Sequence, residues 1–109
     1  MTRKEVYDMI TGMGYPAAYN HYPDQTQKAP PFICFYYAQS NDMIADNHNY
    51  TKIEQIVIEL FTAKKDFAAE QAVEAVLRAN DLPYTRVEDY FDDEKMYMQT
   101  YTTEVLIDE

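Results

Sequence analysis

Two groups of polar side chains in this sequence have residue types that could support chemistry. The first lies within residues 40–50, where Asp42, Asp46 and His48 offer oxygen and nitrogen ligands for a cation. A Ca²⁺ loop requires a denser alternation of oxygen ligands and a glycine at its sharp turn, and this segment has neither. Structural zinc sites use cysteine and histidine, and neither His48 nor His21 has another such residue at ligand spacing. We therefore expect no bound metal ion.

The second group is acidic and surrounds a predicted turn. Its members are Glu88, Asp89, Asp92, Asp93 and Glu94. Paired carboxylates act as general acid and base where an apolar pocket raises the pKa of one of them, but a turn offers no such pocket. The pattern is therefore more typical of a solvated turn. The alternative from another functional class is a small acidic metal-dependent hydrolase that combines this cluster with Asp42 and Asp46.

Other signatures of catalysis are missing from the sequence. It contains no glycine-rich phosphate loop and no Gly-x-Ser-x-Gly nucleophile motif, so phosphate binding and acyl transfer have no local support. The single cysteine, Cys34, lies in the apolar run FICFYY, where a buried and unreactive thiol is expected. We expect no catalytic residues, no cofactor and no enzymatic activity.

Composition restricts the possible partners. The 109 residues are enough for one domain, residues 1–109, with one core. Nineteen acidic against nine basic residues give a formal charge of −10, which repels phosphate backbones and argues against specific nucleic-acid binding. No targeting segment and no apolar stretch of membrane-spanning length is visible, so we expect no membrane association.

Eleven tyrosines, each with an apolar ring and a polar tip, suit protein interfaces. Tyr84, Tyr90, Tyr97 and Tyr101 could form a stacking platform for single-stranded nucleic acid, but without basic neighbours they are more typical of a core edge or a protein interface.

The segment from 49 to 80 organises the predicted fold. Within residues 51–62, Ile56, Ile58 and Leu60 recur at every second position and predict a strand with one dry face. The period then changes to three and four residues, which predicts a helix that packs back on the sheet. Asp66 is the expected N-cap of this helix and Asn80 its end.

The remaining predicted elements have weaker signals in the sequence or are shorter. Thr2 and Glu5 have the spacing of a capping box, so residues 3–11 should form a helix. Further strands are expected at 15–22 (a short edge strand), 32–39 (near the centre of the sheet), 84–90 and 96–107. Residues 40–50 should form a long hairpin loop with Met43 and Ile44 as an exposed apolar tip. The predicted fold is α+β, with an antiparallel or mixed sheet and two helices packed on one face.

Several segments together resemble a known family. These are PPFICFYY, SNDMIADNHNY, KIEQIVIELFTAKKD with the following helix, and the acidic hairpin that ends in a strand. They resemble the tail-completion, or tail-terminator, proteins of long-tailed phages and prophages of Gram-positive bacteria. The likeness covers nearly the whole chain and is firmest over residues 30–66. Its motifs are structural, and they bring no catalytic residue with them.

The resemblance implies a structural role in the virion. A small α+β subunit would form a homo-oligomeric ring, a hexamer, on the head-proximal end of the tail tube, after assembly in the host cytoplasm. Its partners would be its own copies, the major tail tube protein and a head-tail connector protein. The runner-up role is a head-completion or connector protein of the head-tail joint. Asp46, Asn47 and Tyr50 are interface candidates by their place in the matching loop, beside Met43 and Ile44. Asp92, Asp93 and Glu94 are candidates for the lumen of the ring or its rim.

Overall fold

The computed structural model describes residues 1–20 and 29–108 and has an α+β architecture. Helices α1 and α2 span Arg3–Thr11 and Phe67–Ala79. The strands of the described residues are β1 (Ala17–Tyr19), β2 (Phe32–Ser40), β3 (Met43–Ala45), β4 (His48–Thr51), β5 (Ile53–Thr62), β6 (Tyr84–Phe91) and β7 (Met96–Leu106). The expected fold class and the expected helices and strands from residue 51 onward are confirmed.

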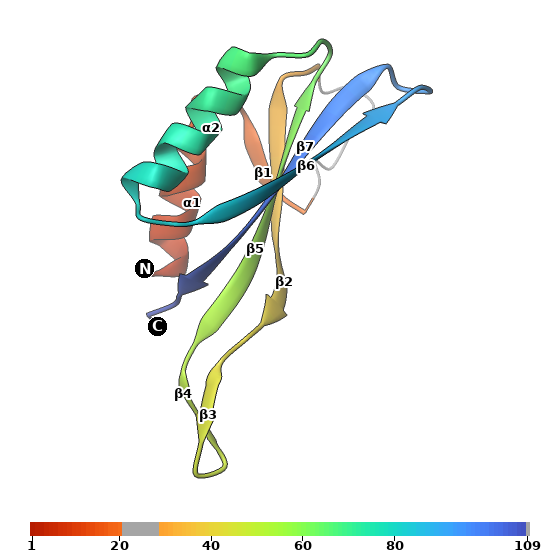
Figure 1. Cartoon of the computed structure of the whole chain (residues 1–109). Coiled ribbons are helices and arrows are strands. Elements are labelled where there is room, and N and C mark those ends of the chain that lie inside the picture. The colour runs from red at the N-terminus through yellow and green to blue at the C-terminus, as the bar shows by residue number, and fades with distance from the viewer. Residues whose placement is uncertain (21–28, 109) are drawn as a thin grey trace.

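Five strands form a mixed sheet in the order β1-β2-β5-β7-β6. All neighbours are antiparallel except β1 and β2, which run parallel. Both helices cover the same face of this sheet, as Figure 1 shows, and the two ends of the chain meet beside them. The amino group of Met1 donates a hydrogen bond to the carbonyl oxygen of Leu106 at 2.8 Å. Strand β5 is the central strand and β2 lies next to it.

The core forms where the dry face of β5 meets the helices. Ile56, Ile58 and Leu60 are completely buried, as the alternation in the sequence predicts. The register places Phe35 beside Ile58 on one side and Tyr101 on the other. All five side chains belong to the cluster that packs under the helices. The central strand is therefore held both by two hydrogen-bonded neighbours and by the helical layer.

Both helices begin at the predicted caps. The side chain of Thr2 accepts a hydrogen bond from the N–H of Glu5, whose carboxylate accepts one from the N–H of Thr2, so the capping box is complete. The carboxylate of Asp66 accepts from the N–H of Ala69 at 3.0 Å, and Asn80 ends α2. The buried side chains of the two helices then face the sheet: Val6, Met9 and Ile10 from α1, and Ala69, Val73 and Leu77 from α2.

The predicted edge strand at 15–22 is shorter than expected. Only Ala17–Tyr19 forms a strand, at the edge of the sheet, and residues 21 and 22 lie outside the described residues. The predicted polar loop that follows falls largely on residues 21–28, which are also outside the described part of the chain. Pro16 lacks an N–H and cannot donate a backbone hydrogen bond. Its carbonyl oxygen accepts one from the N–H of Ile33 at 2.7 Å.

Residues 40–50 connect two antiparallel strands and expose Met43 and Ile44, as predicted, but the prediction that they form a loop with these two residues at its tip is wrong. Most of this segment forms a two-stranded antiparallel ribbon of β3 and β4, which extends away from the main sheet (Figure 1). Asp46 and Asn47 have positive φ values of 50° and 65°, the conformation of a two-residue type I′ turn, which suits the twist of a hairpin. The tip is therefore Asp46–Asn47, and Met43 and Ile44 lie on the strand that leads to it. We call residues 43–51 the arm.

Replacement of Ile58 by Asp tests the dry face of β5. An unpaired carboxylate at a fully buried position costs several kcal/mol, a large share of the stability of a small domain, so the variant should fail to fold. Val87→Asp is the matched control, because Val87 is 58% exposed on the edge strand and should tolerate the charge. Thermal unfolding followed by circular dichroism provides the measurement. Equal melting temperatures for the two variants would refute the assigned core.

Candidate functional site

The arm is fastened to the main sheet by Asp42. Its carboxylate accepts a hydrogen bond from the N–H of Ile53 at 2.9 Å and another from the side-chain amide of Asn49, also at 2.9 Å. The hydrogen bond from Asn49, followed by that from Ile53, lowers the pKa of Asp42 below its usual value. This carboxylate, which the sequence suggested as a cation ligand, is thus used to join β4 and β5 to the chain that enters the arm.

The side chains of the arm are largely exposed. Met43 is 59%, Ile44 69% and Tyr50 62% accessible to solvent. Ile44 and Asn49 are paired across the ribbon, and the rings of His48 and Tyr50 meet edge to face, with ring centroids 6.4 Å apart. A two-stranded ribbon alone has only marginal stability in water, and exposed apolar side chains on it favour contact with a partner.

The side chains considered in the sequence as possible cation ligands, Asp42, Asp46 and His48, do not form a metal site. Among residues 1–20 and 29–108, no group of three or more His, Cys, Asp or Glu side chains could hold a metal ion. Asp46 occupies the turn of the arm, and its positive φ gives it a conformational role that the sequence pattern did not reveal. Cys34 is 1% exposed, so the predicted burial of its thiol is confirmed.

The acidic turn lies at the opposite end of the sheet from the arm (Figure 1). Asp92, Asp93 and Glu94 are exposed between β6 and β7, as predicted for a solvated turn. Thr62, at the end of β5 remote from the arm, pairs with Tyr97 next to this turn. The carboxylates that the hydrolase hypothesis combines are therefore separated by the length of β5.

Glu88 differs from the other acids of this cluster because it is part of an ordered network. Lys65 places its ammonium group 2.6 Å from the carboxylate of Glu88 and 2.7 Å from that of the buried Glu70. The hydrogen bonds that Lys65 donates, first that to Glu70 and then that to Glu88, raise the pKa of Lys65, and the bond from Lys65 lowers the pKa of Glu88. The buried Gln99 donates to Glu88 at 2.7 Å and accepts from Arg86 at 2.6 Å. The network joins the start of α2 to β6 and β7.

The four tyrosines of the C-terminal hairpin do not form one stacking platform. Tyr101 is completely buried and donates its hydroxyl to Glu74 at 2.8 Å. Tyr84 donates to the same carboxylate at 3.1 Å and meets Tyr101 edge to face. Tyr90 and Tyr97 form a separate pair, with ring centroids 4.8 Å apart. Tyr101 thus belongs to the core and Tyr84 to its edge, and burial raises the pKa of both hydroxyl groups.

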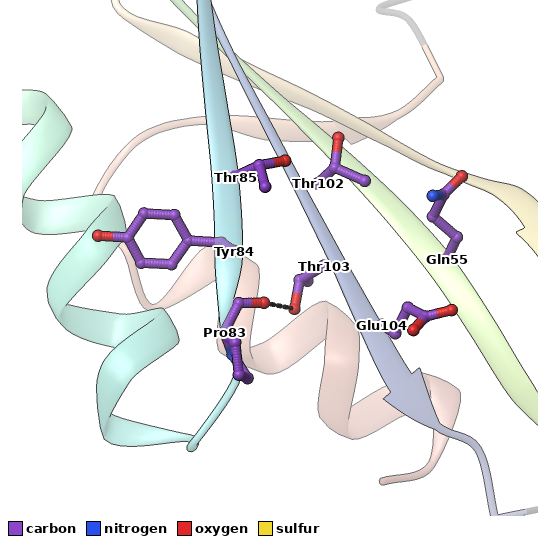
Figure 2. A pocket seen from close by; sticks show the side chains of 7 residues that line it. All are labelled: Gln55, Pro83, Tyr84, Thr85, Thr102, Thr103 and Glu104. Carbon is purple, nitrogen blue, oxygen red and sulfur yellow. Dashed lines mark hydrogen bonds between the residues drawn. The ribbon is translucent and has the colours of Figure 1, made fainter.

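An open groove of about 400 Å³ crosses three strands near the arm end of the sheet. It is lined by Gln55, Pro83, Tyr84, Thr85, Thr102, Thr103 and Glu104 (Figure 2). The hydroxyl group of Thr103 donates to the carbonyl oxygen of Pro83 at 2.7 Å and fixes the start of β6 against β7. The carboxylate of Glu104 accepts a hydrogen bond from the side-chain amide of Asn41. Sequence reasoning missed this groove because its residues come from three separate segments and share no motif.

Comparison with models of known protein families and with curated proteins finds no match for this chain. Within the described ranges, neither helix has the length and apolar character needed to cross a membrane. The fold and the surfaces described above are therefore the basis for a functional proposal.

The role of Asp42 can be tested by Asp42→Ala. Loss of both hydrogen bonds at the base should speed amide hydrogen exchange in residues 43–51 at least several-fold, with little effect on the core of β5. In the parent protein, the NMR titration midpoint of Asp42 should lie below about 3.9. Since its pKa is lowered by folding, the stabilisation is present above the unfolded pKa and is lost as pH falls through the folded value. An ordinary midpoint together with unchanged exchange would contradict this role.

Proposed function

We propose that this protein is a non-enzymatic structural subunit of a phage virion that caps the head-proximal end of the tail tube as a ring and forms the surface for head docking. The observation that carries the proposal is the arm, which displays Met43, Ile44 and Tyr50 on a ribbon anchored by Asp42. The likeness of residues 30–66 to tail-completion proteins supplies the biological setting. In that setting the partners are other copies of the chain, the major tail tube protein and a head-tail connector protein.

The distribution of polar groups is compatible with an assembly role. The charged residues in the interior are used to join elements: Glu70 meets Lys65, and Glu74 meets Tyr101. Among the described residues, every buried side-chain nitrogen and oxygen atom has a hydrogen-bond partner. The features that remain for recognition are therefore at the surface, in the arm, the groove and the acidic turn.

Removal of the gene for this protein from its phage tests the role directly. If the subunit stops tube growth, electron microscopy of lysates should show tail tubes longer than normal and not joined to heads. Tails of normal length that remain unattached would instead assign the protein to the head side of the joint, as a connector. Particles of normal length that retain their heads would exclude both roles.

Replacement of Met43 and Ile44 by Ser tests the arm as an interaction surface. Both side chains are more than half exposed, so the melting temperature should change by only a few degrees. Assembly should nevertheless be weakened, since the loss of apolar contacts at an interface reduces binding. Complementation of the deletion phage, scored by tail length, provides the measurement. Val87→Ser is a control with similar exposure, and parallel losses of folding and assembly in the double variant would place these side chains in the subunit's own core.

Replacement of Asp92, Asp93 and Glu94 by Lys tests whether the acidic turn faces the lumen or its rim. A ring of six copies would carry a formal charge on the order of −60, and a negative lining would keep DNA from adhering during passage. The variant should form tails of normal length but deliver DNA less efficiently. Infection efficiency per assembled particle measures this effect. Unchanged delivery from correctly assembled particles would show that these acids only solubilise the free subunit.

A further inference from the structure

The arm and the groove offer complementary features on one chain. The arm projects beyond the sheet, and its large side chains Met43, Ile44 and Tyr50 are mostly exposed. The groove runs across the starts of β5 and β6 and the end of β7, and its lining is mostly polar, with Gln55, Glu104 and three threonines beside Pro83, while the ring of Tyr84 points toward α2. Such a lining offers threonine methyl groups and the Pro83 ring for apolar contact, and hydroxyl and amide groups for hydrogen bonds.

Size favours a ribbon as the occupant of this groove. A volume of about 400 Å³, spread openly over three strands, suits several side chains of an extended segment better than one enclosed ligand. The three exposed side chains of the arm each present on the order of 100 Å². That total is less than half of the roughly 800 Å² per partner in a standard interface. A single contact of this kind would therefore be weak, and stable association would need each copy to make two contacts.

Charge decides which surfaces of two such chains can meet. Each copy carries a formal charge of −10, so contact between the acidic surfaces is opposed. In the arm and the groove, the carboxylates of Asp42 and Glu104 accept hydrogen bonds from the neutral amides of Asn49 and Asn41, which hold these carboxylates in place but leave their charge. A contact between the two surfaces must therefore bring the apolar side chains of the arm onto the groove while Asp42 and Asp46 stay apart from Glu104, and salt should favour it by screening these charges.

From these observations we propose that the arm of one copy lies in the groove of a second copy, with the exposed side chains of residues 43–50 packed against Thr85, Thr102 and Pro83. The arm and the groove are different surfaces, so repetition of this contact in one direction joins copies head to tail and can close a ring. That head-to-tail order rests on the proposed function, whereas the contact between arm and groove does not.

Disulfide trapping between two single variants tests the contact. A tagged chain carrying Ile44→Cys or Tyr50→Cys, which lie on the two different strands of the ribbon, is mixed at high concentration with an untagged chain carrying Thr85→Cys. Mild oxidation should give several-fold more mixed dimer than the same tagged chain gives with Ala75→Cys. Ala75 is exposed on α2 and remote from the groove, and Cys34, which every variant retains, is 1% exposed in the parent structure. Equal yields with Thr85→Cys and Ala75→Cys, for both tagged chains, would overturn the proposal.

A chain carrying both the more efficient arm cysteine and Thr85→Cys tests the order of copies. Head-to-tail contact should give a ladder of trimers and larger species, whereas a product that stops at dimers would overturn that order. These outcomes are separate from the proposed function, which is decided by tail length in the deletion phage. Efficient trapping with normal tails in the deletion phage would leave the contact standing and remove the tail role. Overlong tails in the deletion phage without any disulfide trapping would support the tail role and remove the contact between arm and groove.

Discussion

Burial of one face of β5 is the constraint on which the rest of the structure depends. Ile56, Ile58 and Leu60 are completely buried, and full burial of such a side chain contributes about 1.5–3 kcal/mol. Their burial requires the two helices on that face and a hydrogen-bonded strand on each side, β2 and β7. The arm joins one end of β5 and the chain to α2 leaves the other, so the position of β5 also determines where the proposed interaction surfaces lie.

Sequence periodicity was sufficient to predict the helices and strands that are stabilised by local contacts or by burial of one apolar face. The alternation in 53–62 and the helical spacing in 67–79 each report on burial against a single layer, so their pattern could be recognised without the tertiary structure. The caps Thr2 and Asp66 were predictable for the same reason, because each binds an N–H only three residues away. Fold class followed from the order of these elements and the short connections between them.

What sequence reasoning could not provide depends on contacts between distant residues. Ala17–Tyr19 pairs parallel to β2, and the pattern of residues in so short a strand carries no information on direction. The bond from Lys65 to Glu88 spans 23 residues, and the groove combines Gln55 with residues near 84 and 103. The arm was missed for a different reason. Asp46–Asn47 is a recognisable two-residue turn, but the polar composition of 40–50 is also typical of a loop, and it was interpreted as one.

The separation of charged and apolar surfaces bears on how like-charged copies could associate at all. The molecule is about 50 Å long, with the arm at one end and the acidic turn at the other. At physiological ionic strength the potential of a charge falls over a Debye length of about 8 Å. The turn of a copy is therefore several Debye lengths from its own arm, so its charge contributes little repulsion to a contact made at the arm end. Had Asp92, Asp93 and Glu94 also been next to Met43 and Ile44, in addition to Asp42 and Asp46, the weak apolar contact available there would have had to overcome stronger repulsion at close range.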